Sequence, residues 1–358
     1  MSETHVTPNN DAPQHAPRPL PLFLNMLREE TAASPERRAA ALKGLSAYQN
    51  ARRGRKRASK PVSARAGRAR LRDYGRDPAG VPVVVVPSLI NPPQVLDLRN
   101  ASLMRWLARH KGLRPMLVDW GTPVARIDTQ DVAGHVEALL VPLLAALDQP
   151  PILVGYCLGG TMAAAAAALH PVRALAMIAA PWRFSGFSAQ ALQEIDSLWH
   201  AAEPMCRSLG LVPMEVLQSG FWRLDPARTV RKFERFAALE PGSPTARSFV
   251  VLEDWANGGA PLTYAAGRQM FDDFFAADLP GMGRWHVGGK PVDPLSLGVP
   301  VVEFVSTTDR IVPFASAAGF ADQRITSAGH VGMVVGSKRR DVLWKPLRDW
   351  IRGQVLPK

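Results

Sequence analysis

The chain has 358 residues, 47% of them hydrophobic, which suffices to bury a large interior around one α/β core. No apolar run reaches the roughly 18 residues that a membrane-spanning helix needs, and the polar N-terminus lacks the hydrophobic stretch of a signal peptide. The two cysteines, Cys157 and Cys206, exclude a disulfide framework and have no metal-ligand spacing. We therefore expect a soluble, cytoplasmic protein without a transmembrane segment or a metal site.

The formal net charge of +12 is concentrated in one segment. Residues 52–76 contain eleven Lys or Arg and one acidic residue, Asp73, a net charge of +10. Such a run more often forms a solvated linker than a specific nucleic-acid reader, although non-specific attraction to phosphate is expected. We therefore place residues 1–80 outside the core, as a disordered or helical basic N-terminal region.

Within this region, residues 1–18 have the composition of a disordered tail. Residues 20–30 predict a short apolar helix. Ser34-Pro35-Glu36 is typical of a helix start, with an N-cap and a proline at the first helical position, and predicts a helix toward Arg52. The turn residues 77–80 then lead into the core.

From residue 81 onward, short apolar runs alternate with helical patterns, which predicts a mostly parallel sheet with helices on both faces. The predicted strands are 83–87, 115–120, 152–155, 174–179, 300–305 and 324–326. The predicted helices are 101–110, 131–147, 161–169 and 338–352. The alternation breaks between residues 183 and 292, a segment expected to form a helical cap inserted between two parts of the core, 81–182 and 293–358.

The strongest local motif is Gly155-Tyr156-Cys157-Leu158-Gly159-Gly160, between a predicted strand and a predicted helix. This is the context of the G-x-S-x-G nucleophile elbow, with cysteine in place of serine. The tight turn leaves no room for side chains beside the nucleophile, which explains the glycines. A lone cysteine is more often a small buried hydrophobe, and Cys206 is interpreted in that way. For Cys157 the context predicts a nucleophile whose thiolate the helix dipole favours.

A tetrahedral oxyanion requires backbone N–H donors near the nucleophile. The N–H of Leu158, directly after Cys157, is the first candidate. The second is expected from the loop after the first core strand, where we assign Leu89 or Ile90.

His330 is the predicted general base, and Asp309 the residue that orients it. In α/β proteins with such a nucleophile elbow, the acidic residue of the triad follows the nucleophile along the chain and the histidine comes last. Each of the two follows a predicted strand, at the carboxyl edge where α/β sites assemble, and Gly329 is expected to let the loop carry the imidazole inward. A loop-capping role is the alternative for Asp309. The remaining histidines fall in the tail, on helices or in the cap: His5, His15, His110, His135, His170, His200 and His286.

Several further segments occur in the order and spacing of one known family. They are Pro87–Asn91 with Val95–Leu98, Ser102–Leu107, Asp119-Trp120, the Cys157 motif, Leu252–Gly259, Val287–Asp293, and the Asp309 and His330 strings. From about Val83 to Val335 the chain resembles the polyhydroxyalkanoate synthases, α/β-hydrolase-fold enzymes that polymerise (R)-3-hydroxyacyl-CoA through a catalytic cysteine. It departs from them at Arg310, where the family usually has histidine, at residues 92–94 and at residues 331–333.

The resemblance implies an acyltransferase that carries (R)-3-hydroxyacyl groups from CoA thioesters on Cys157. It implies acyl-CoA as substrate, no other cofactor, a homodimer or partner subunit, and association with a polymer granule. One alternative is a thioesterase or carboxylesterase with the same triad. Another is a non-catalytic protein that docks on granules or nucleic acid through the basic segment. Aromatic residues of the cap either line an acyl channel or, for most of them, simply pack: Trp182, Phe184, Phe187, Trp199, Phe221 and Trp222.

Overall fold

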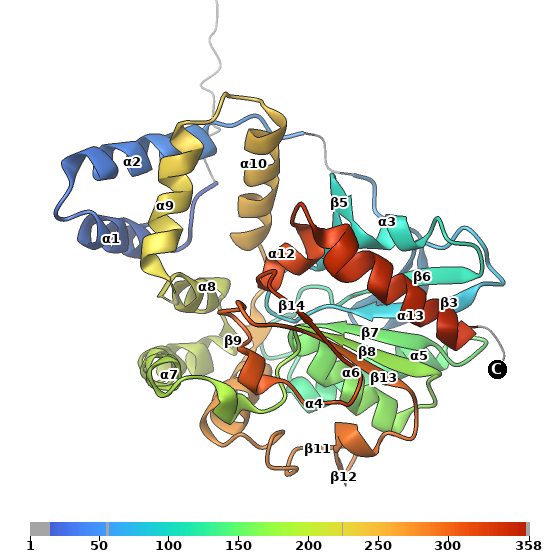
Figure 1. Cartoon of the computed structure of the whole chain (residues 1–358). Helices are drawn as coiled ribbons and strands as arrows, with labels where there is room; N and C mark the ends of the chain where they lie inside the picture. Colours follow the sequence, from blue (N-terminus) through green and yellow to red (C-terminus); the bar gives the residue numbers. More distant parts are fainter. Residues whose placement is uncertain (1–14, 55–56, 224, 356–358) are drawn as a thin grey trace, which may run out of the picture. The chain divides into compact units, whose positions relative to one another are not determined.

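The computed structural model describes residues 15–54, 57–223 and 225–355 (Figure 1). Most of the predicted disordered tail, residues 1–14, lies outside the described residues. The described residues divide into two compact units, the smaller formed by residues 15–54 with 221–223 and 225–257, and the larger by residues 57–220 with 258–355. Among the described residues, no helix combines the length and the apolar character needed to cross a bilayer.

A single large sheet organises the larger unit. In the part of the chain that is described, it has eight strands in the order β1-β2-β6-β3-β7-β8-β13-β14. The strands are β1 (Val62–Ala66), β2 (Ala69–Asp73), β3 (Val81–Val86), β6 (Leu113–Asp119), β7 (Ile152–Tyr156), β8 (Ala174–Ile178), β13 (Val301–Ser306) and β14 (Gln323–Thr326). Strand β2 runs antiparallel to both neighbours, and the other pairs are parallel. This is the sheet of the α/β-hydrolase fold, as predicted.

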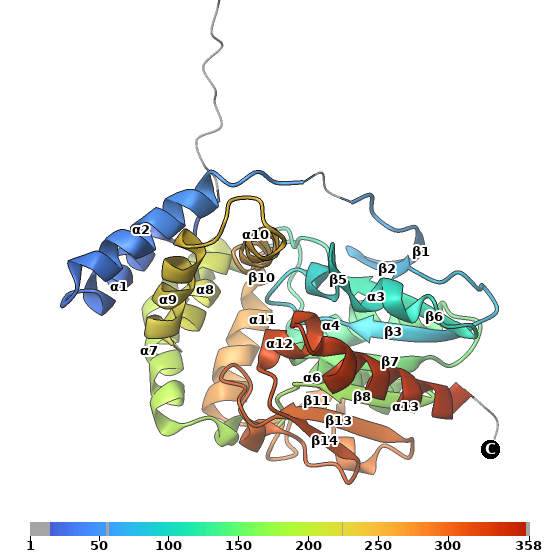
Figure 2. The same ribbon diagram turned by 45° about the horizontal axis from the view of Figure 1, so that its top comes forward.

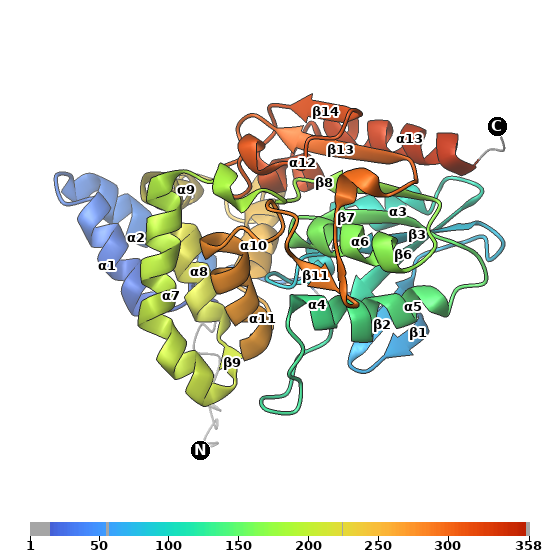
Figure 3. The ribbon, with the colours of Figure 1, turned by 90° about the horizontal axis from the view of Figure 1, so that it is seen from below.

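Helices cover both faces of the sheet (Figure 3). One face carries α3 (Leu103–Leu107), α12 (His330–Val335), η7 (Arg340–Trp344) and α13 (Lys345–Val355). The other carries α4 (Val132–His135), η2 (Val136–Leu140), α5 (Val141–Ala145) and α6 (Leu158–Leu169). Strands covered on both sides need apolar residues at every position, and β7 is buried along its whole length.

The core begins earlier than the predicted residue 81. Strands β1 and β2 form its first hairpin, turned at Gly67, whose φ is +52°. Two of the basic residues thought to be solvated lie here in ion pairs: Arg68 with Asp128 (2.8 Å) and Arg72 with Asp119 (2.7 Å). These strands were not recognised in the sequence because they contain arginines at alternating positions. A hairpin at the edge of a sheet can carry such charged side chains on its solvent-exposed face.

The smaller unit is a group of helices (Figure 2). The predicted N-terminal helices are confirmed as α1 (Leu20–Glu30) and α2 (Pro35–Gln49), and the Ser34 hydroxyl accepts from the Arg37 N–H at the start of α2. They join α9 (Pro226–Ala237) and α10 (Pro244–Ala256) around a core that contains Phe23, Tyr48 and Phe233. Residues 221–257 therefore do not group with the rest of the predicted cap.

The remaining elements of the predicted cap are short apart from two helices. They are η3 (Phe184–Gly186), α7 (Ala189–Leu209), β9 (Leu211–Val212), α8 (Met214–Arg223), β10 (Leu262–Thr263), α11 (Tyr264–Arg268), η4 (Gln269–Ala276), β11 (His286–Val287) and β12 (Lys290–Pro291). The cap aromatics mostly pack, since Trp199 stacks on Phe271 with ring centroids 4.6 Å apart and Phe184 lies parallel to Phe187. Shorter elements within the core are η1 (Pro93–Leu96), β4 (Asp97–Leu98), β5 (Ala101–Ser102), η5 (Pro294–Ser296) and η6 (Phe314–Ser316).

Candidate active site

Cys157 lies at the turn between β7 and α6. Its backbone angles, φ 56° and ψ −136°, fall in a region that residues with side chains rarely adopt. The Cys157 N–H donates to the Ile178 carbonyl of β8 (3.0 Å), and the Cys157 carbonyl accepts from the Gly160 N–H (2.8 Å). The strained turn is therefore held from the sheet on one side and from the helix on the other.

The glycines around Cys157 are required by close backbone contacts, as the motif predicts. A Cβ atom on Gly155 would lie 2.3 Å from the Gly160 Cα atom, and one on Gly159 would lie 2.2 Å from the Val86 carbonyl oxygen. A Cβ atom on Gly160 would lie 2.3 Å from the Cβ atom of Ala180. These distances are far below van der Waals contact, so the start of α6 can approach β3, β7 and β8 only without side chains.

Asp309 and His330 lie side by side, as expected from their positions after β13 and β14. The Asp309 Oδ2 atom is 2.7 Å from the His330 Nδ1 atom, and both residues are buried. The other carboxylate oxygen, Oδ1, accepts from the N–H groups of Ile311 (2.8 Å) and Val312 (3.0 Å). Since a carboxylate only accepts, Nδ1 carries a proton and Nε2 is left for another partner.

The electrostatics of the site point to Cys157 as that partner. Burial by itself lowers the pKa of His330, but the negative charges of Cys157 and Asp309, together with hydrogen bonds to both, outweigh it and raise the pKa to about 10. These interactions favour the protonated form of the imidazole. Pairing with an imidazolium is one way in which proteins activate a cysteine.

Tyr156 supports the imidazole from the sheet. Its ring centroid is 5.0 Å from that of His330, and its hydroxyl donates to the His330 carbonyl (3.4 Å). Burial, and then the negative charges of Cys157 and Asp309, raise the pKa of Tyr156 well above its ordinary value, so the phenol stays protonated. Sequence reasoning missed this residue because the elbow motif leaves its position open to any side chain.

Comparison with known proteins supports the family resemblance. No protein-family model matches the chain. The chain is 28% identical over 287 residues to the poly(3-hydroxyalkanoate) polymerase subunit of Haloferax mediterranei, covering 75% of this chain and 58% of that protein. It is 23% identical over 308 residues to the subunit of the same name from Synechocystis, covering 79% of this chain and 80% of that protein. The chain is therefore similar to poly(3-hydroxyalkanoate) polymerase subunits over about three quarters of its length.

The extent of this relationship differs among the relatives. The chain spans only 58% and 60% of the lengths of the similar proteins from Haloferax mediterranei and Haloarcula marismortui. Among solved structures, the esterase RhEst1 from Rhodococcus is 15% identical, with a TM-score of 0.47 over 83% of this chain and 98% of that chain. At such scores the strand order of the sheet, rather than these structures, carries the fold assignment.

His330 is the first residue of α12 rather than part of a loop. Gly329 precedes it as the N-cap, with φ −62° and ψ 168°, an extended backbone that any residue can adopt. A Cβ atom on Gly329 would meet nothing nearer than the Thr308 carbonyl oxygen, 4.0 Å away. The backbone conformation and the free space at this position therefore do not require a glycine.

The oxyanion donors proposed from the sequence lie in two segments. Leu158 begins α6, where the first N–H groups of a helix have no acceptor within the helix. In the loop after β3, the Ile90 N–H donates to the Ser88 hydroxyl (3.2 Å), and the Trp120 indole N–H donates to the Pro87 carbonyl (3.0 Å). Of the two residues assigned to this loop, Leu89 is the better candidate because the Ile90 N–H is engaged within it.

The second cysteine and the other histidines have different surroundings. Cys206 is buried in α7, and burial, followed by the charge of Glu203, raises the pKa of its thiol. Burial lowers the pKa of His135 to about 4, which keeps that ring neutral beside Arg68. Four histidines have a ring nitrogen within hydrogen-bonding distance of a nearby backbone carbonyl: His135, His170, His200 and His286. Among the described residues, no cluster of three or more His, Cys, Asp or Glu is arranged to hold a metal ion.

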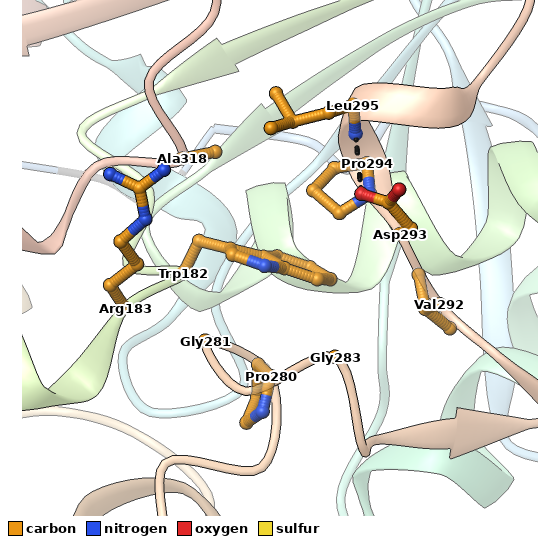
Figure 4. Close-up of a pocket in the computed structure, with 10 residues that line it drawn as sticks. All are labelled: Trp182, Arg183, Pro280, Gly281, Gly283, Val292, Asp293, Pro294, Leu295 and Ala318. Carbon is orange, nitrogen blue, oxygen red and sulfur yellow. Dashed lines mark hydrogen bonds between the residues drawn. The ribbon is translucent and has the colours of Figure 1, made fainter.

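A small pocket of about 100 Å³ opens elsewhere in the larger unit (Figure 4). It is lined by Trp182, Arg183, Pro280, Gly281, Gly283, Val292, Asp293, Pro294, Leu295 and Ala318. The Asp293 carboxylate accepts from the Leu295 N–H (3.0 Å) at its rim. None of the triad residues lines this pocket, so it is a feature distinct from the candidate active site.

Proposed function

We propose that this chain is a cysteine-dependent acyltransferase that takes (R)-3-hydroxyacyl groups from CoA thioesters through an acyl-Cys157 intermediate. The observation that carries the proposal is the buried Asp309–His330 pair beside a cysteine held in an elbow turn. The substrate class is suggested by the relatives, which are poly(3-hydroxyalkanoate) polymerase subunits. Acyl-CoA is the only small molecule that the proposed reaction requires.

In the first half of the proposed reaction, the Cys157 thiolate attacks the thioester carbonyl. The carbon–sulfur bond to the enzyme forms while negative charge collects on the carbonyl oxygen, where the N–H groups of Leu158 and Leu89 stabilise it. When the tetrahedral intermediate collapses, CoA leaves as a thiol with the proton that His330 held on Nε2. Asp309 keeps the imidazole in the orientation that this transfer needs.

In the second half, the hydroxyl group of another hydroxyacyl unit is the acceptor. His330, now neutral, takes the hydroxyl proton while the oxygen attacks the acyl-Cys157 carbonyl. An ester bond forms, and the Cys157 thiolate and the imidazolium are restored. A thiol nucleophile suits this cycle, because exchange between two thioesters is chemically balanced.

Hydrolysis is the second candidate function, as a thioesterase or carboxylesterase with the same triad. The observation that favours it is the partial exposure of Cys157, which is not fully buried as His330 and Asp309 are. Water that reaches the acyl-enzyme would replace the hydroxyl acceptor in the second half of the cycle.

Incubation with 3-hydroxybutyryl-CoA tests the proposal. We expect release of CoA, an acyl adduct on Cys157 detected by mass spectrometry, and insoluble polymer. The Cys157→Ala variant should lose all three, while Cys206→Ala, which removes a buried thiol of α7, serves as the matched control. Monomeric acid without polymer would favour the hydrolase, and unchanged turnover in Cys157→Ala would refute both.

A purely binding role through the basic segment needs a sharper test than truncation. Removing residues 1–76 would delete β1 and β2 and so damage the sheet. Arg65 and Arg70 are exposed cross-strand neighbours on this hairpin, so the double variant R65Q/R70Q removes charge without removing a strand. If the chain docks on DNA or granules through this hairpin, the variant should bind them more weakly, with a shallower salt dependence.

Cytoplasmic location, association with a polymer granule, and a homodimer or partner subunit remain parts of the proposal. The location is an expectation from the sequence, and the granule and the partner subunit follow from the resemblance to the synthases. Fractionation of polymer-accumulating cells that express the chain, and sedimentation of the purified protein, test these parts separately from the chemistry.

A further inference from the structure

The loops that carry Asp309 and His330 leave neighbouring parallel strands. The last registered pair of β13 and β14 is Ser306 with Thr326. Past this pair, one backbone hydrogen bond continues the ladder, from the Thr307 N–H to the Thr326 carbonyl (3.0 Å). Beyond that point one segment leads to Asp309 and the other to His330.

A side chain supplies the next connection. The Thr308 hydroxyl donates to the Ser327 carbonyl (2.7 Å), and the Thr308 N–H donates to the Ser306 hydroxyl (3.1 Å). Thr308 directly precedes Asp309, and Ser327 lies in the short segment that leads to His330. The hydroxyl thus joins the acid loop to the histidine loop at the position where a further backbone bond would stand.

Within each loop, the triad residue is held by local contacts. The Asp309 carboxylate is fixed by the N–H groups of Ile311 and Val312, and His330 begins α12. Those contacts orient each side chain in its own loop but do not set the spacing between the loops. Packing does not set it at Gly329 either, because even an added Cβ atom would stay 4.0 Å from the Thr308 carbonyl oxygen.

We propose that Thr308 is a positioning residue that fixes the spacing of the Asp309–His330 pair through its hydroxyl group. The proposal rests on the proposed function for its kinetic consequences, but the contact itself can be measured without substrate. Because this hydrogen bond is exposed to solvent, its loss should change the alignment of the pair far more than the stability of the fold.

The test compares three variants in a Cys206→Ala background, so that alkylation reports on Cys157 alone. Thr308→Val removes the hydroxyl and keeps the shape of the side chain, and Thr308→Ser restores the hydroxyl. Thr307→Val is the matched control. It removes a neighbouring exposed hydroxyl whose hydrogen bond to the Thr326 carbonyl is long, 3.5 Å, and therefore weak. Each protein is examined for iodoacetamide alkylation rate, single-turnover acylation by 3-hydroxybutyryl-CoA, and the downfield proton resonance of the imidazole Nδ1–H.

We expect Thr308→Val to weaken or shift the downfield resonance and to slow acylation by about three- to tenfold, the range that one net hydrogen bond spans. Substrate KM and the urea midpoint should change little, and Thr308→Ser should recover most of the rate. A Thr308→Val protein with the resonance and the acylation rate of Thr307→Val would overturn the positioning role. An unmodified protein that shows neither accelerated alkylation nor an acyl adduct would instead refute the proposed function.

Discussion

The two halves of the candidate active site are built in different ways. The elbow, residues 155–160, is held by backbone atoms in contact: three glycines avoid collisions, and Cys157 adopts a strained φ of 56°. The acid and histidine loops, residues 307–312 and 327–330, are held by hydrogen bonds among side chains and backbone. A structure set by steric exclusion changes abruptly on mutation, whereas one set by hydrogen bonds changes by degrees.

Removal of the base has the largest expected effect. His330→Ala leaves Cys157 without its proton acceptor, so single-turnover acylation should fall by at least about a thousandfold. Rapid-quench mass spectrometry of the acyl adduct measures it. Substitution of His200, an exposed histidine of α7, is the control and should change nothing. Acylation that persists within tenfold in His330→Ala would break the assignment of the base.

A methyl group at the elbow should act on folding. Gly159→Ala places a Cβ atom against the Val86 carbonyl and should lower the free energy of unfolding by about 2 to 3 kcal/mol. Gly353→Ala, in α13 where an added Cβ atom meets nothing within 4 Å, should instead be neutral or stabilise by about 0.5 to 1 kcal/mol. Urea unfolding of both variants measures the contrast, and equal effects would contradict a sterically defined elbow.

The strain at Cys157 predicts a smaller effect on stability. Glycine adopts a positive φ without a Cβ penalty, so Cys157→Gly should be more stable than Cys157→Ala by about 1 kcal/mol. Both variants lack the sulfur atom and should be inactive. If alanine proves the more stable replacement, the turn is not strained in solution.

The charge interaction between Asp309 and His330 should make the stability of the fold depend on pH. The pKa of His330 is raised to about 10, so the stability gained from its protonation is fully present below an unfolded-state pKa of about 6.5 and is lost as pH rises through the folded value. Asp309→Asn removes one of the charges that raise this pKa, so the alkaline loss of stability should begin at lower pH. Urea midpoints measured across the alkaline range test the shift. Coincident profiles for the two proteins would contradict a charge interaction between Asp309 and His330.

The smallest expected effect concerns Tyr156. Tyr156→Phe keeps the ring beside His330 and removes a hydroxyl whose hydrogen bond is long, 3.4 Å. Acylation should slow by less than about threefold, because such a bond contributes little. Tyr156→Leu, which removes the ring as well, should cost more. Equal effects of the two variants would show that the ring contact does not support the imidazole.

Most of the core could be predicted because the signals are local. Apolar runs located β3, β6, β7, β8 and β13 within a few residues, since strands buried on both faces need apolar side chains throughout. The edge strand β14 was also predicted, although it is only partly buried. The elbow could be predicted because its glycines avoid collisions with atoms that lie only a few residues away or in the adjacent strand. The order of Cys157, Asp309 and His330 then indicated which loops should meet.

Only the tertiary structure decided the features that depend on distant partners. From the sequence alone, the arginines of β1, β2 and their turn indicate a solvated linker. In the structure two of them form ion pairs with Asp119 and Asp128, which come later in the chain. Residues 221–257 join the N-terminal helices through close approaches such as that of Gly44 to Phe233, which lie about half the length of the chain apart in the sequence. The sequence by itself determined the fold class and the elbow, because both follow from local periodicity and sterics. The loop-to-loop contact of Thr308 and the support from Tyr156 required the path of the folded chain.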